Sequence, residues 1–538
     1  MGFDCSGDDL GQVGDEMLTV WNRSRNCHSV HHSILSRIDY ILTYVITNRV
    51  TLTQSQAMKF HVDHPGARRF LLAAALSLTV AACSDNASVD AELQTIIDSL
   101  ALTGDAAQGR TVPDISSDKA QLGMKLFFTK GLGGDMDSAC VTCHHPVMGG
   151  GDNLALPVGV GAETPDLLGP GRFHASTSAH YDGGPTVPRN APTTFNIFLW
   201  DRVLFHDGRI ESIGKTPGAN GDDGFGIITP DTKPLADADA VSLTQAQARF
   251  PVTSPEEMKG FVFQSGSSNS ALRTALEARL QSDWGSEFTA VYGDSSVTFA
   301  RISDAIAEYE RTQTFTANPW RDYVAGDSTA ISAAAKRGAL LFFRSVADGG
   351  ANCASCHSGD FFSDEAFHVL AMPQVGRGKG NGPTMTDDFG RFRETGNMDD
   401  MYAFRTPSLL NVEVTGPWSH AGAYSTLEGV VRHHLNVADA VNNYDASQLD
   451  STVQITDLST NTQSALAKLQ ANRTNGVPSI VDVSLTDAQV SDLVAFLEAL
   501  TDPCVEDRAC LAAWIPASGD TDPDGLRLQA VDASNNPL

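Results

Sequence analysis

The chain has 538 residues, and its 37 lysines and arginines against 65 aspartates and glutamates give a formal net charge of −28 at pH 7. This length allows two or more domains with ample cores. The acidic balance argues against nucleic acid and against an anionic membrane surface as partners, and it favours small substrates or a basic protein.

The first segment is not expected to belong to the folded protein. Residues 1–57 show no clear hydrophobic period and precede what reads as a complete export signal, so we interpret them as an extension from a mis-assigned start codon. Cys5 and Cys27 lie in this extension and have no function in this interpretation.

Residues 58–83 have the pattern of a lipoprotein signal peptide. Basic residues precede an apolar run from Phe70 to Ala82, and small residues lead directly to Cys83. Cys83 would then become the lipidated first residue, and residues 84–114 would form a tether. An ordinary signal peptide that is cut nearby is the alternative. No other run is long and apolar enough to span a bilayer.

Two Cys-x-x-Cys-His motifs, at residues 140–144 and 353–357, are the most informative feature. The two thiols of such a motif add to haem vinyl groups as thioethers, and the histidine faces the iron. A redox Cys-x-x-Cys does not need the histidine, and a zinc site usually needs a second pair at short spacing. We therefore predict two covalently bound haem c groups and a periplasmic location, because bacteria attach haem c outside the cytoplasm. The predicted attachment residues are Cys140, Cys143 and His144 for the first haem, and Cys353, Cys356 and His357 for the second.

A repeat surrounds the two motifs. A short amphipathic helix leads into each motif, at residues 123–128 and 338–343. A further helix follows each motif, at residues 303–311 and 487–500, and Thr486 is the expected N-cap of the last one.

This repeat predicts a mainly α fold of two tandem cytochrome c-like haem domains. The N-terminal domain would span residues 115–325 and the C-terminal domain residues 326–500. Glycine- and proline-rich stretches at 149–192, 214–240 and 373–390 are expected to be long loops rather than strands.

Residues 501–538 are expected to form a separate acidic tail. Cys504 and Cys510 could form a disulfide in an oxidising compartment. Residues 520–525 resemble the start of a calcium loop, but the twelfth position of such a loop is not acidic here. We therefore interpret the segment as a solvated tail.

Over about residues 115–500 the chain resembles the bacterial dihaem cytochrome c peroxidases, a family that includes the MauG-type enzymes. The resemblance implies that peroxide reacts at the N-terminal haem, whereas the C-terminal haem handles electrons. Besides the haem motifs it rests on five segments, at residues 189–193, 205–209, 255–258, 310–312 and 404–409.

The resemblance assigns Gln247, Pro251 and Glu257 to the peroxide pocket. A carboxylate above the haem can take a proton from one peroxide oxygen and return it to the other, which assists heterolytic cleavage of the O–O bond. Gln247 would orient the peroxide or a water molecule. The alternative for Glu257 is an exposed glutamate at the start of a helix.

The second haem needs a sixth ligand if it is to transfer electrons. Residues 425–428 read as a capping box that opens a helix, and His434 lies on its apolar face. A histidine there is often a core residue. However, the resemblance places an axial ligand seven residues after Leu427, so we expect ligation by His357 and His434, with Met372 as the alternative. His433 would point elsewhere. Two imidazoles imply a lower potential than a histidine–methionine pair.

The resemblance also implies one calcium ion between the haems. Its ligands would be the side chain of Asn190 and the carbonyl oxygens of Thr415 and Pro417, completed by waters. Asn190 could equally be an ordinary turn residue.

The chain departs from the family pattern in two places. His206 occupies the position of a tryptophan that relays electrons between the haems, and imidazole is a much poorer hole carrier than indole. Transfer would then be direct, or would use Trp200 or another aromatic residue. An insertion between Arg209 and Gln247 is expected near the peroxide site. His180 could ligate the first iron in a resting state or could lie at the surface.

These observations predict a periplasmic peroxidase, lipid-anchored at Cys83. It would reduce hydrogen peroxide to water with electrons from a small cytochrome c or a cupredoxin. A MauG-type enzyme that oxidises side chains of a partner protein is one alternative. The other is a non-catalytic dihaem electron carrier, against which Gln247 and Glu257 argue.

Overall fold

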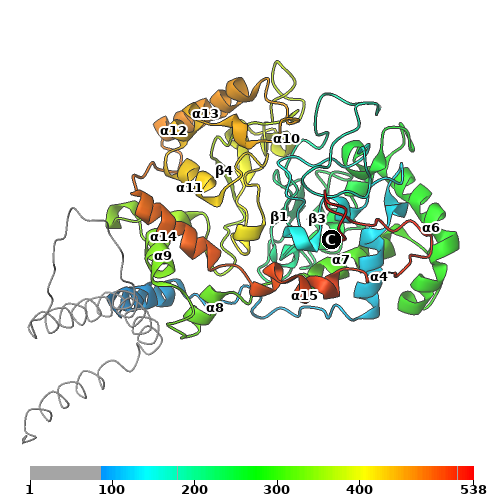
Figure 1. Ribbon diagram of the computed structural model, residues 1–538, viewed down its shortest axis with the longest axis horizontal. Coiled ribbons are helices and arrows are strands. Elements are labelled where there is room, and N and C mark those ends of the chain that lie inside the picture. Colours follow the sequence, from blue (N-terminus) through cyan, green and yellow to red (C-terminus); the bar gives the residue numbers. More distant parts are fainter. Residues whose placement is uncertain (1–86, 179, 518) are drawn as a thin grey trace, which may run out of the picture. The chain divides into compact units, whose positions relative to one another are not determined.

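The computed structural model describes residues 87–178, 180–517 and 519–538 (Figure 1). The predicted extension and the predicted signal peptide with Cys83 lie outside the described residues. The chain divides into residues 1–89 and a second unit, Asp90–Leu538, which contains everything discussed below. None of its described helices has both the length and the apolar character needed to cross a membrane.

Each half of this unit has one pair of packed helices at its centre, and the two pairs have the same design. In the N-terminal half, α4 (Asp118–Phe128) packs against α7 (Phe299–Thr312), and in the C-terminal half α9 (Ala333–Phe343) packs against α14 (Asp487–Glu498). A glycine makes each crossing possible. A Cβ atom on Gly123 would collide with the carbonyl of Ala305, and one on Gly338 with the carbonyl of Asp492.

The predicted mainly α fold is confirmed, since helices far outweigh strands. Thr486 caps α14 as expected, with its side chain bonded to the backbone of Gln489. The remaining described α-helices are one at residues 87–100, α5 (Leu243–Gln247), α6 (Asn269–Tyr292), α8 (Pro319–Val324), α10 (Phe392–Thr395), α11 (Leu427–Leu435), α12 (Val437–Asn442), α13 (Leu458–Thr474) and α15 (Arg508–Leu511).

The strands are short and form two small antiparallel sheets. One contains β1 (Val203–Leu204), β2 (Ile210–Ser212) and β3 (Ile227–Ile228), and the other contains β4 (Phe367–Val369) and β5 (Ala403–Arg405). In the first sheet Leu204 pairs with Ile210, and in the second His368 pairs with Phe404. Strand β3 lies in a stretch that we expected to be entirely loop.

The described part of the segment predicted to be a tether is instead packed on the folded protein, with its helix on the C-terminal half and Arg110 paired with Asp201 of the N-terminal half. Leu93 and Ile97, one helical turn apart, are buried, and Glu92 pairs with Arg344 at 2.5 Å. Asp360 then accepts hydrogen bonds from the backbone of residues 103 and 104. The prediction was wrong here because two apolar residues in a polar stretch suffice to anchor one helix.

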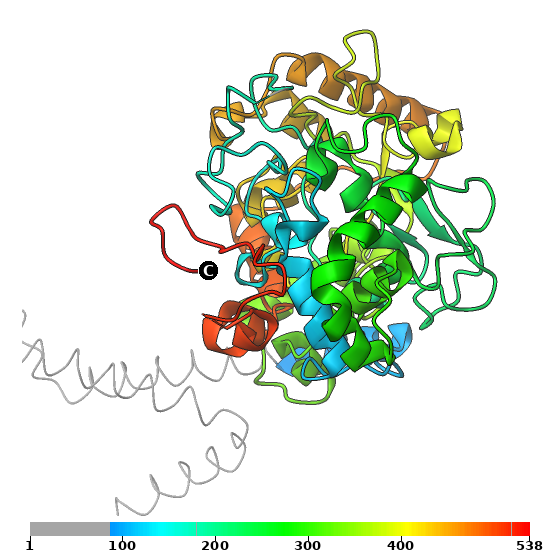
Figure 2. The ribbon, with the colours of Figure 1, turned by 90° about the vertical axis from the view of Figure 1, so that its right-hand side faces the viewer.

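The C-terminal segment is not a solvated tail either. Cys504 and Cys510 form the predicted disulfide. The chain then returns to the N-terminal half, seen in red in Figures 1 and 2, where the Tyr309 hydroxyl donates to the carbonyl of Trp514 at 2.7 Å. Trp284 donates to Asp524 at 2.8 Å.

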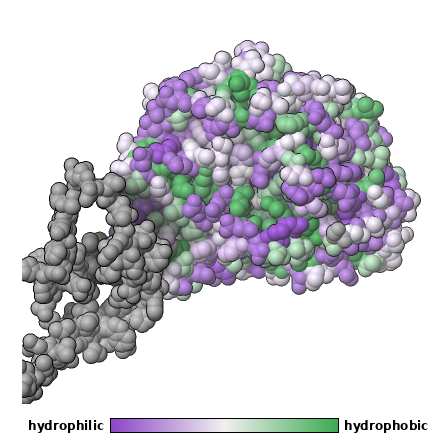
Figure 3. Space-filling model, viewed as in Figure 1, coloured by the Kyte–Doolittle hydropathy of each residue, from purple (hydrophilic) through white to green (hydrophobic). Residues whose placement is uncertain are grey.

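The acidic residues of this segment have partners within the protein. Arg527 pairs with the buried Asp522, and Asp524 also accepts from Thr129 at 3.1 Å. Asp520 accepts from the N–H of Ala517 at 3.2 Å, so all three aspartates of the calcium-like sequence bind protein groups. On the face shown in Figure 3, hydrophilic side chains predominate and apolar ones form small scattered groups.

Candidate functional site

Both Cys-x-x-Cys-His motifs adopt the same tight turn. The N–H of Cys143 bonds the carbonyl of Cys140 at 3.2 Å, and the N–H of Cys356 bonds that of Cys353 at 3.3 Å. This turn brings the two thiols of each motif to one side of the chain. None of these four cysteines forms a disulfide within the described residues.

The two motif histidines are held in the same tautomer. Nδ1 of His144 lies 3.1 Å from the carbonyl oxygen of Gly150, and Nδ1 of His357 lies 3.1 Å from that of Phe362. A carbonyl can only accept, so Nδ1 carries the proton and Nε2 keeps its lone pair for a metal. These donor sets fit two haem c groups.

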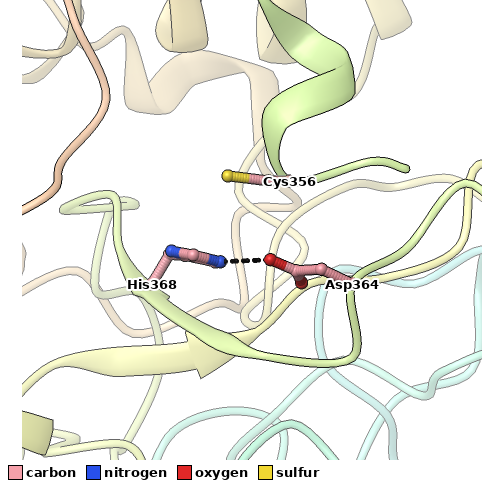
Figure 4. A group of neighbouring side chains, drawn as sticks. All are labelled: Cys356, Asp364 and His368. Carbon is pink, nitrogen blue, oxygen red and sulfur yellow. Dashed lines mark hydrogen bonds and ion pairs between the residues drawn. The ribbon is translucent and has the colours of Figure 1, made fainter. Parts of the chain in front are cut away.

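One group of side chains near the second motif also has the composition of a metal site (Figure 4). Cys356, Asp364 and His368 offer ligand atoms within 4.8 Å of one another, and His368 bonds Asp364 at 2.7 Å. The hydrogen bond to Asp364 raises the pKa of His368 to about 10, so the two residues form an ion pair. We assign no metal here, because Cys356 belongs to the haem motif.

His434 lies across from His357 in a geometry that suits a shared metal. Their ring centres are 6.4 Å apart, and Nδ1 of His434 donates to the carbonyl of Val430, which leaves Nε2 free. Two imidazoles on opposite sides of one metal place their ring centres roughly 6 Å apart, given metal–nitrogen bonds of about 2 Å. Ligation by His434 stays a prediction, with Met372, which is buried, as the alternative.

His433 is used differently, as predicted from its position on the helix. It is fully buried, its Nε2 donates to the carbonyl of Leu370, and its Nδ1 accepts from the hydroxyl of Tyr424. The start of α11 differs from the expected capping box. Thr426 is the N-cap, and Glu428 pairs with Arg432 instead of reaching back to the backbone.

The three predicted pocket residues lie close together along the chain at turns. Gln247 ends α5, Pro251 begins a 3₁₀ turn, and Glu257 lies in a single π-helical turn at Pro255–Lys259. Isolated π turns are frequent at functional sites. All three side chains are half-buried, so Glu257 is not the exposed glutamate of the alternative interpretation.

The surroundings of Glu257 determine its charge. Burial raises the pKa of its carboxyl, and the nearby Arg209 and Lys379 oppose this rise. The turn itself is held by packing, because Met258 is buried and the backbone at Gly159 lies directly against the carbonyls of Glu256 and Glu257. Sequence analysis did not identify Lys379, and no local pattern could have pointed to it.

A buried ion network joins the two halves and extends to Arg209, one of the cations near Glu257. Arg189 bonds both carboxylate oxygens of Asp388, at 2.6 and 2.8 Å, and also bonds Asp207 at 2.6 Å. Asp207 contacts Arg209 at 3.2 Å. Burial alone would raise the pKa of Asp207, but Arg189 and Arg209 hold it well below its usual range.

One donor of this region is available for an anionic cofactor group. Arg189, Arg209, Lys379 and Arg405 lie among the carboxylates Asp207, Asp388, Glu257 and Glu365, so the charges balance in number. However, Nε of Arg405 is buried without a partner in the described part of the chain. Haem carries two carboxylates on one edge, and such a group would supply an acceptor for this donor.

The position of the expected relay residue is occupied by a neutral imidazole. Nε2 of His206 bonds the carbonyl of Asn190 at 3.1 Å, and burial together with Arg189 and Arg405 lowers the pKa of His206 to about 3. Trp200 is also buried, and the guanidinium of Arg405 lies 3.5 Å above its ring.

Trp200 belongs to an apolar cluster that extends toward both predicted haem sites. The cluster includes Phe250, which precedes Pro251, and Phe361, which follows His357 by four residues. The insertion is anchored to the same region, because Asn220 donates to the carbonyl of Trp200 and accepts from the N–H of Leu243 in α5. The insertion therefore supports the helix that carries Gln247.

The proposed calcium ligands lie against one loop, residues 149–155. The side-chain nitrogen of Asn190 donates to the carbonyls of Leu154 and Ala155, and the backbone of Gly149 lies against the segment that contains Thr415. Pro417 follows a cis peptide bond two residues later. The calcium ion stays a prediction. So does any resting-state role of His180, whose ring stacks on Phe261 at 3.9 Å.

Comparison with known proteins supports the resemblance seen in the sequence. Residues 117–329 match the family model described as di-haem cytochrome c peroxidase. The predicted resemblance to this family is confirmed over the matched residues. The chain is 28% identical over 372 residues to the methylamine utilization protein MauG of Methylorubrum extorquens. The matched residues are 67% of this chain and 81% of that protein.

Further relatives carry peroxidase names. The cytochrome c551 peroxidase of Nitrosomonas europaea is 25% identical over 364 residues, which are 68% of this chain and 84% of that protein. Among solved structures, the diheme peroxidase BthA from Burkholderia thailandensis matches with a TM-score of 0.49 and 19% identity over 79% of this chain and 92% of that chain. The family thus contains both peroxidases and MauG proteins.

The ion network between the halves predicts a loss of stability at low pH. Burial raises the pKa of Asp388, but the ion pair with Arg189 lowers it by more. The pKa is therefore about 2, below the ordinary value of 3.8. Its contribution is therefore present above about pH 4 and is lost as the pH falls toward 2. We expect Asp388→Asn to lower the free energy of unfolding by about 3 kcal/mol at pH 7, and by progressively less below pH 4, in urea titrations.

A surface pair provides the control for this prediction. Asp482 pairs with Arg473 at 2.9 Å while partly exposed, so Asp482→Asn should cost about 0.5 kcal/mol or less. Equal effects of the two substitutions would contradict a structural role for the buried network.

Proposed function

We propose that the protein is a periplasmic dihaem peroxidase that reduces hydrogen peroxide to water. The N-terminal haem, attached through Cys140, Cys143 and His144, would be the peroxide site. The second haem, held by Cys353, Cys356, His357 and His434, would deliver electrons. The haem groups supply the redox chemistry that the side chains of this chain lack.

The asymmetry between the two motif histidines is the observation that carries this proposal. His357 faces a second imidazole with a free Nε2, whereas no comparable ring pair involves His144 in the described part of the chain. An electron-transfer haem benefits from two permanent ligands, and a peroxide site requires one open position. The same pattern argues against a simple electron carrier.

The side chains of the pocket would perform the proton transfers. Glu257 takes a proton from one oxygen of peroxide as a base and returns it to the other as an acid. Gln247 orients the substrate through its amide, and Pro251 shapes the wall of the pocket. Burial of Glu257 helps, because a raised pKa improves the carboxyl group as the acid of the second step.

The charges between the haem sites favour a peroxidase over a MauG-type enzyme. Removing an electron from the Trp200 ring is disfavoured by the guanidinium of Arg405 stacked on it, and His206 is a poor carrier beside two arginines. Formation of an oxidised Trp200 or His206 as an intermediate is therefore opposed, and electrons would pass directly from the second haem to the first. They would enter the second haem from outside, and the net charge of −28 suits a basic cytochrome c or cupredoxin.

Peroxide titration of the haem-loaded protein tests this function. We expect rapid turnover with a reduced small cytochrome c, followed by its optical spectrum. A long-lived oxidised state formed from the diferric protein without added electrons would instead indicate a MauG-type enzyme. Two low-spin haems that do not react with peroxide would indicate an electron carrier.

Replacement of the pocket carboxylate should slow peroxide cleavage. We expect Glu257→Gln to reduce the rate constant of the peroxide reaction by roughly 10²-fold or more in stopped-flow experiments, because the amide cannot accept the proton. Glu256→Gln is the matched control, since Glu256 is the adjacent carboxylate and only weakly contacts Ser254. Unchanged kinetics in Glu257→Gln would rule out its role.

The sixth ligand of the second haem can be tested by spectroscopy. We expect His434→Gly to convert this haem from low spin to high spin in electron paramagnetic resonance, whereas Met372→Leu should leave it low spin. The reverse result would assign the ligand to Met372.

A further inference from the structure

Two short segments hold the turn that carries Glu257, and both contact its backbone. The N–H of Val160 donates to the carbonyl of Glu256 at 3.2 Å, and the N–H of Gly134 donates to the carbonyl of Met258 at 2.8 Å. These two carbonyls belong to the residues directly before and after Glu257. The turn is therefore held on both sides of the pocket carboxylate, and the bonds do not use the carboxylate itself.

The fit between the turn and these segments is too close for a side chain. A Cβ atom on Gly159 would overlap the carbonyl oxygens of Glu256 and Glu257, and one on Gly134 would overlap the carbonyl oxygen of Lys259. Neither glycine has a positive φ, so the backbone conformation does not require glycine at these positions. The close approach of the turn does.

Arg172 holds the first of these segments. Its guanidinium donates to the carbonyl of Val158 at 2.6 Å and to that of Gly159 at 2.8 Å. It also donates to three carbonyls of residues 164–167. The side chain is only 3% exposed. Because a guanidinium presents its donors in one rigid plane, Arg172 fixes these carbonyls relative to one another.

Arg279 of α6 holds the second segment in the same way. Its guanidinium donates to the carbonyls of Gly131 at 3.1 Å and Gly133 at 2.5 Å, and to that of Gly134 at 3.3 Å. It also lies 4.5 Å from the centre of the Phe263 ring. Each segment that contacts the turn is thus tied by one arginine through its own backbone carbonyls.

The two segments lie on either side of the first haem motif in the sequence. Residues 131–134 precede the motif, and residues 158–160 follow it. A further bond joins the two stretches, because the carboxylate of Asp137 accepts from the N–H of Gly161 at 2.7 Å. The turn with the pocket carboxylate is therefore tied to the backbone that leads into and out of the motif.

We propose that Arg172 and Arg279 are positioning residues that fix the carboxylate of Glu257 relative to the first haem motif. They act through the backbone of its turn and do not contact the substrate. A group that transfers protons must lie within hydrogen-bond reach of the reacting atoms, and a displacement of about 1 Å can cost roughly 10²-fold in rate. The inference rests on the proposed function, because it assumes that Glu257 transfers the protons of peroxide.

The contact at Gly159 provides the first test. Gly159→Ala displaces the turn without removing a charge or a hydrogen-bonding group. We expect it to reduce the rate constant of the peroxide reaction of the haem-loaded protein by roughly tenfold or more in stopped-flow experiments. Gly285→Ala in α6 is the matched control and should react like the wild type, since a Cβ atom there meets its nearest neighbour, in Ser295, at 3.4 Å. An unchanged rate constant in Gly159→Ala would overturn the proposal.

A double substitution separates positioning from a general loss of structure. In the Glu257→Gln background, Gly159→Ala should change the rate constant by less than about twofold, because the group that it displaces is already absent. Equal factors with and without the carboxylate would overturn the proposal, since the substitution would then act on the haem or on the fold.

The two arginines are tested by amide hydrogen exchange, which does not depend on turnover. Arg172→Gln and Arg279→Gln should each accelerate exchange in peptides that cover residues 255–260. Arg473→Gln is the control and should leave these peptides unchanged, because Arg473 bonds the carbonyl of Ile480 and the carboxylate of Asp482 in the C-terminal half. Unaltered exchange of residues 255–260 in both variants would overturn the proposal. Arg279 is half-buried, so its variant keeps the test available if Arg172→Gln does not fold.

Failure of the two proposals can be distinguished. A wild-type protein that does not react with peroxide would contradict the proposed function, while hydrogen exchange would still show whether the arginines hold the turn. A reactive wild type in which Gly159→Ala acts equally with and without the Glu257 carboxylate would contradict only the inference drawn here.

Discussion

One buried guanidinium, that of Arg189, connects the two halves of the molecule where their chemistry meets. It bonds both oxygens of Asp388 from one half and an oxygen of Asp207 from the other. A guanidinium presents its donors in a fixed plane, so both carboxylates are held in defined directions. The loops that contain these aspartates also carry Arg209 and Lys379. Arg189 thus holds together the two loops that supply Arg209 and Lys379, two of the charges that act on Glu257.

The two haem motifs show how one local design serves two purposes. In each motif a backbone carbonyl accepts the Nδ1 proton of the histidine and so prepares Nε2 for iron. The two motifs differ in what faces the motif histidine. His357 faces a second imidazole, that of His434 on α11. The fold thus repeats the part that binds the cofactor and varies the part that would set its reactivity.

The features that could be predicted from the sequence are those with short-range signals. The haem motifs, the four helices around them and the capping residue Thr486 are encoded by neighbours within a few positions, and the glycines at the two helix crossings recur in the repeat. The acidic composition of the C-terminal segment predicted a solvated tail, but Asp522 pairs with Arg527 and Asp524 accepts a hydrogen bond from the distant Trp284.

The candidate site was predicted only in part for the same reason. Glu257, Gln247 and Pro251 lie near one another in the sequence and share one stretch of turns. Lys379 belongs to a loop of the other half, and nothing in its local sequence indicates the pocket that it approaches. Pairings between distant loops depend on the packed fold, which no periodicity or spacing expresses.

The path of the last residues has a consequence for the biogenesis of the protein. Residues 512–538 complete the N-terminal half by covering Tyr309, Trp284 and Thr129, which lie in or beside the helices that flank the first motif. That half therefore cannot reach its final packing until the last residues of the chain are present. The proposed attachment of haem to Cys140 and Cys143 would then precede the closure of this cover.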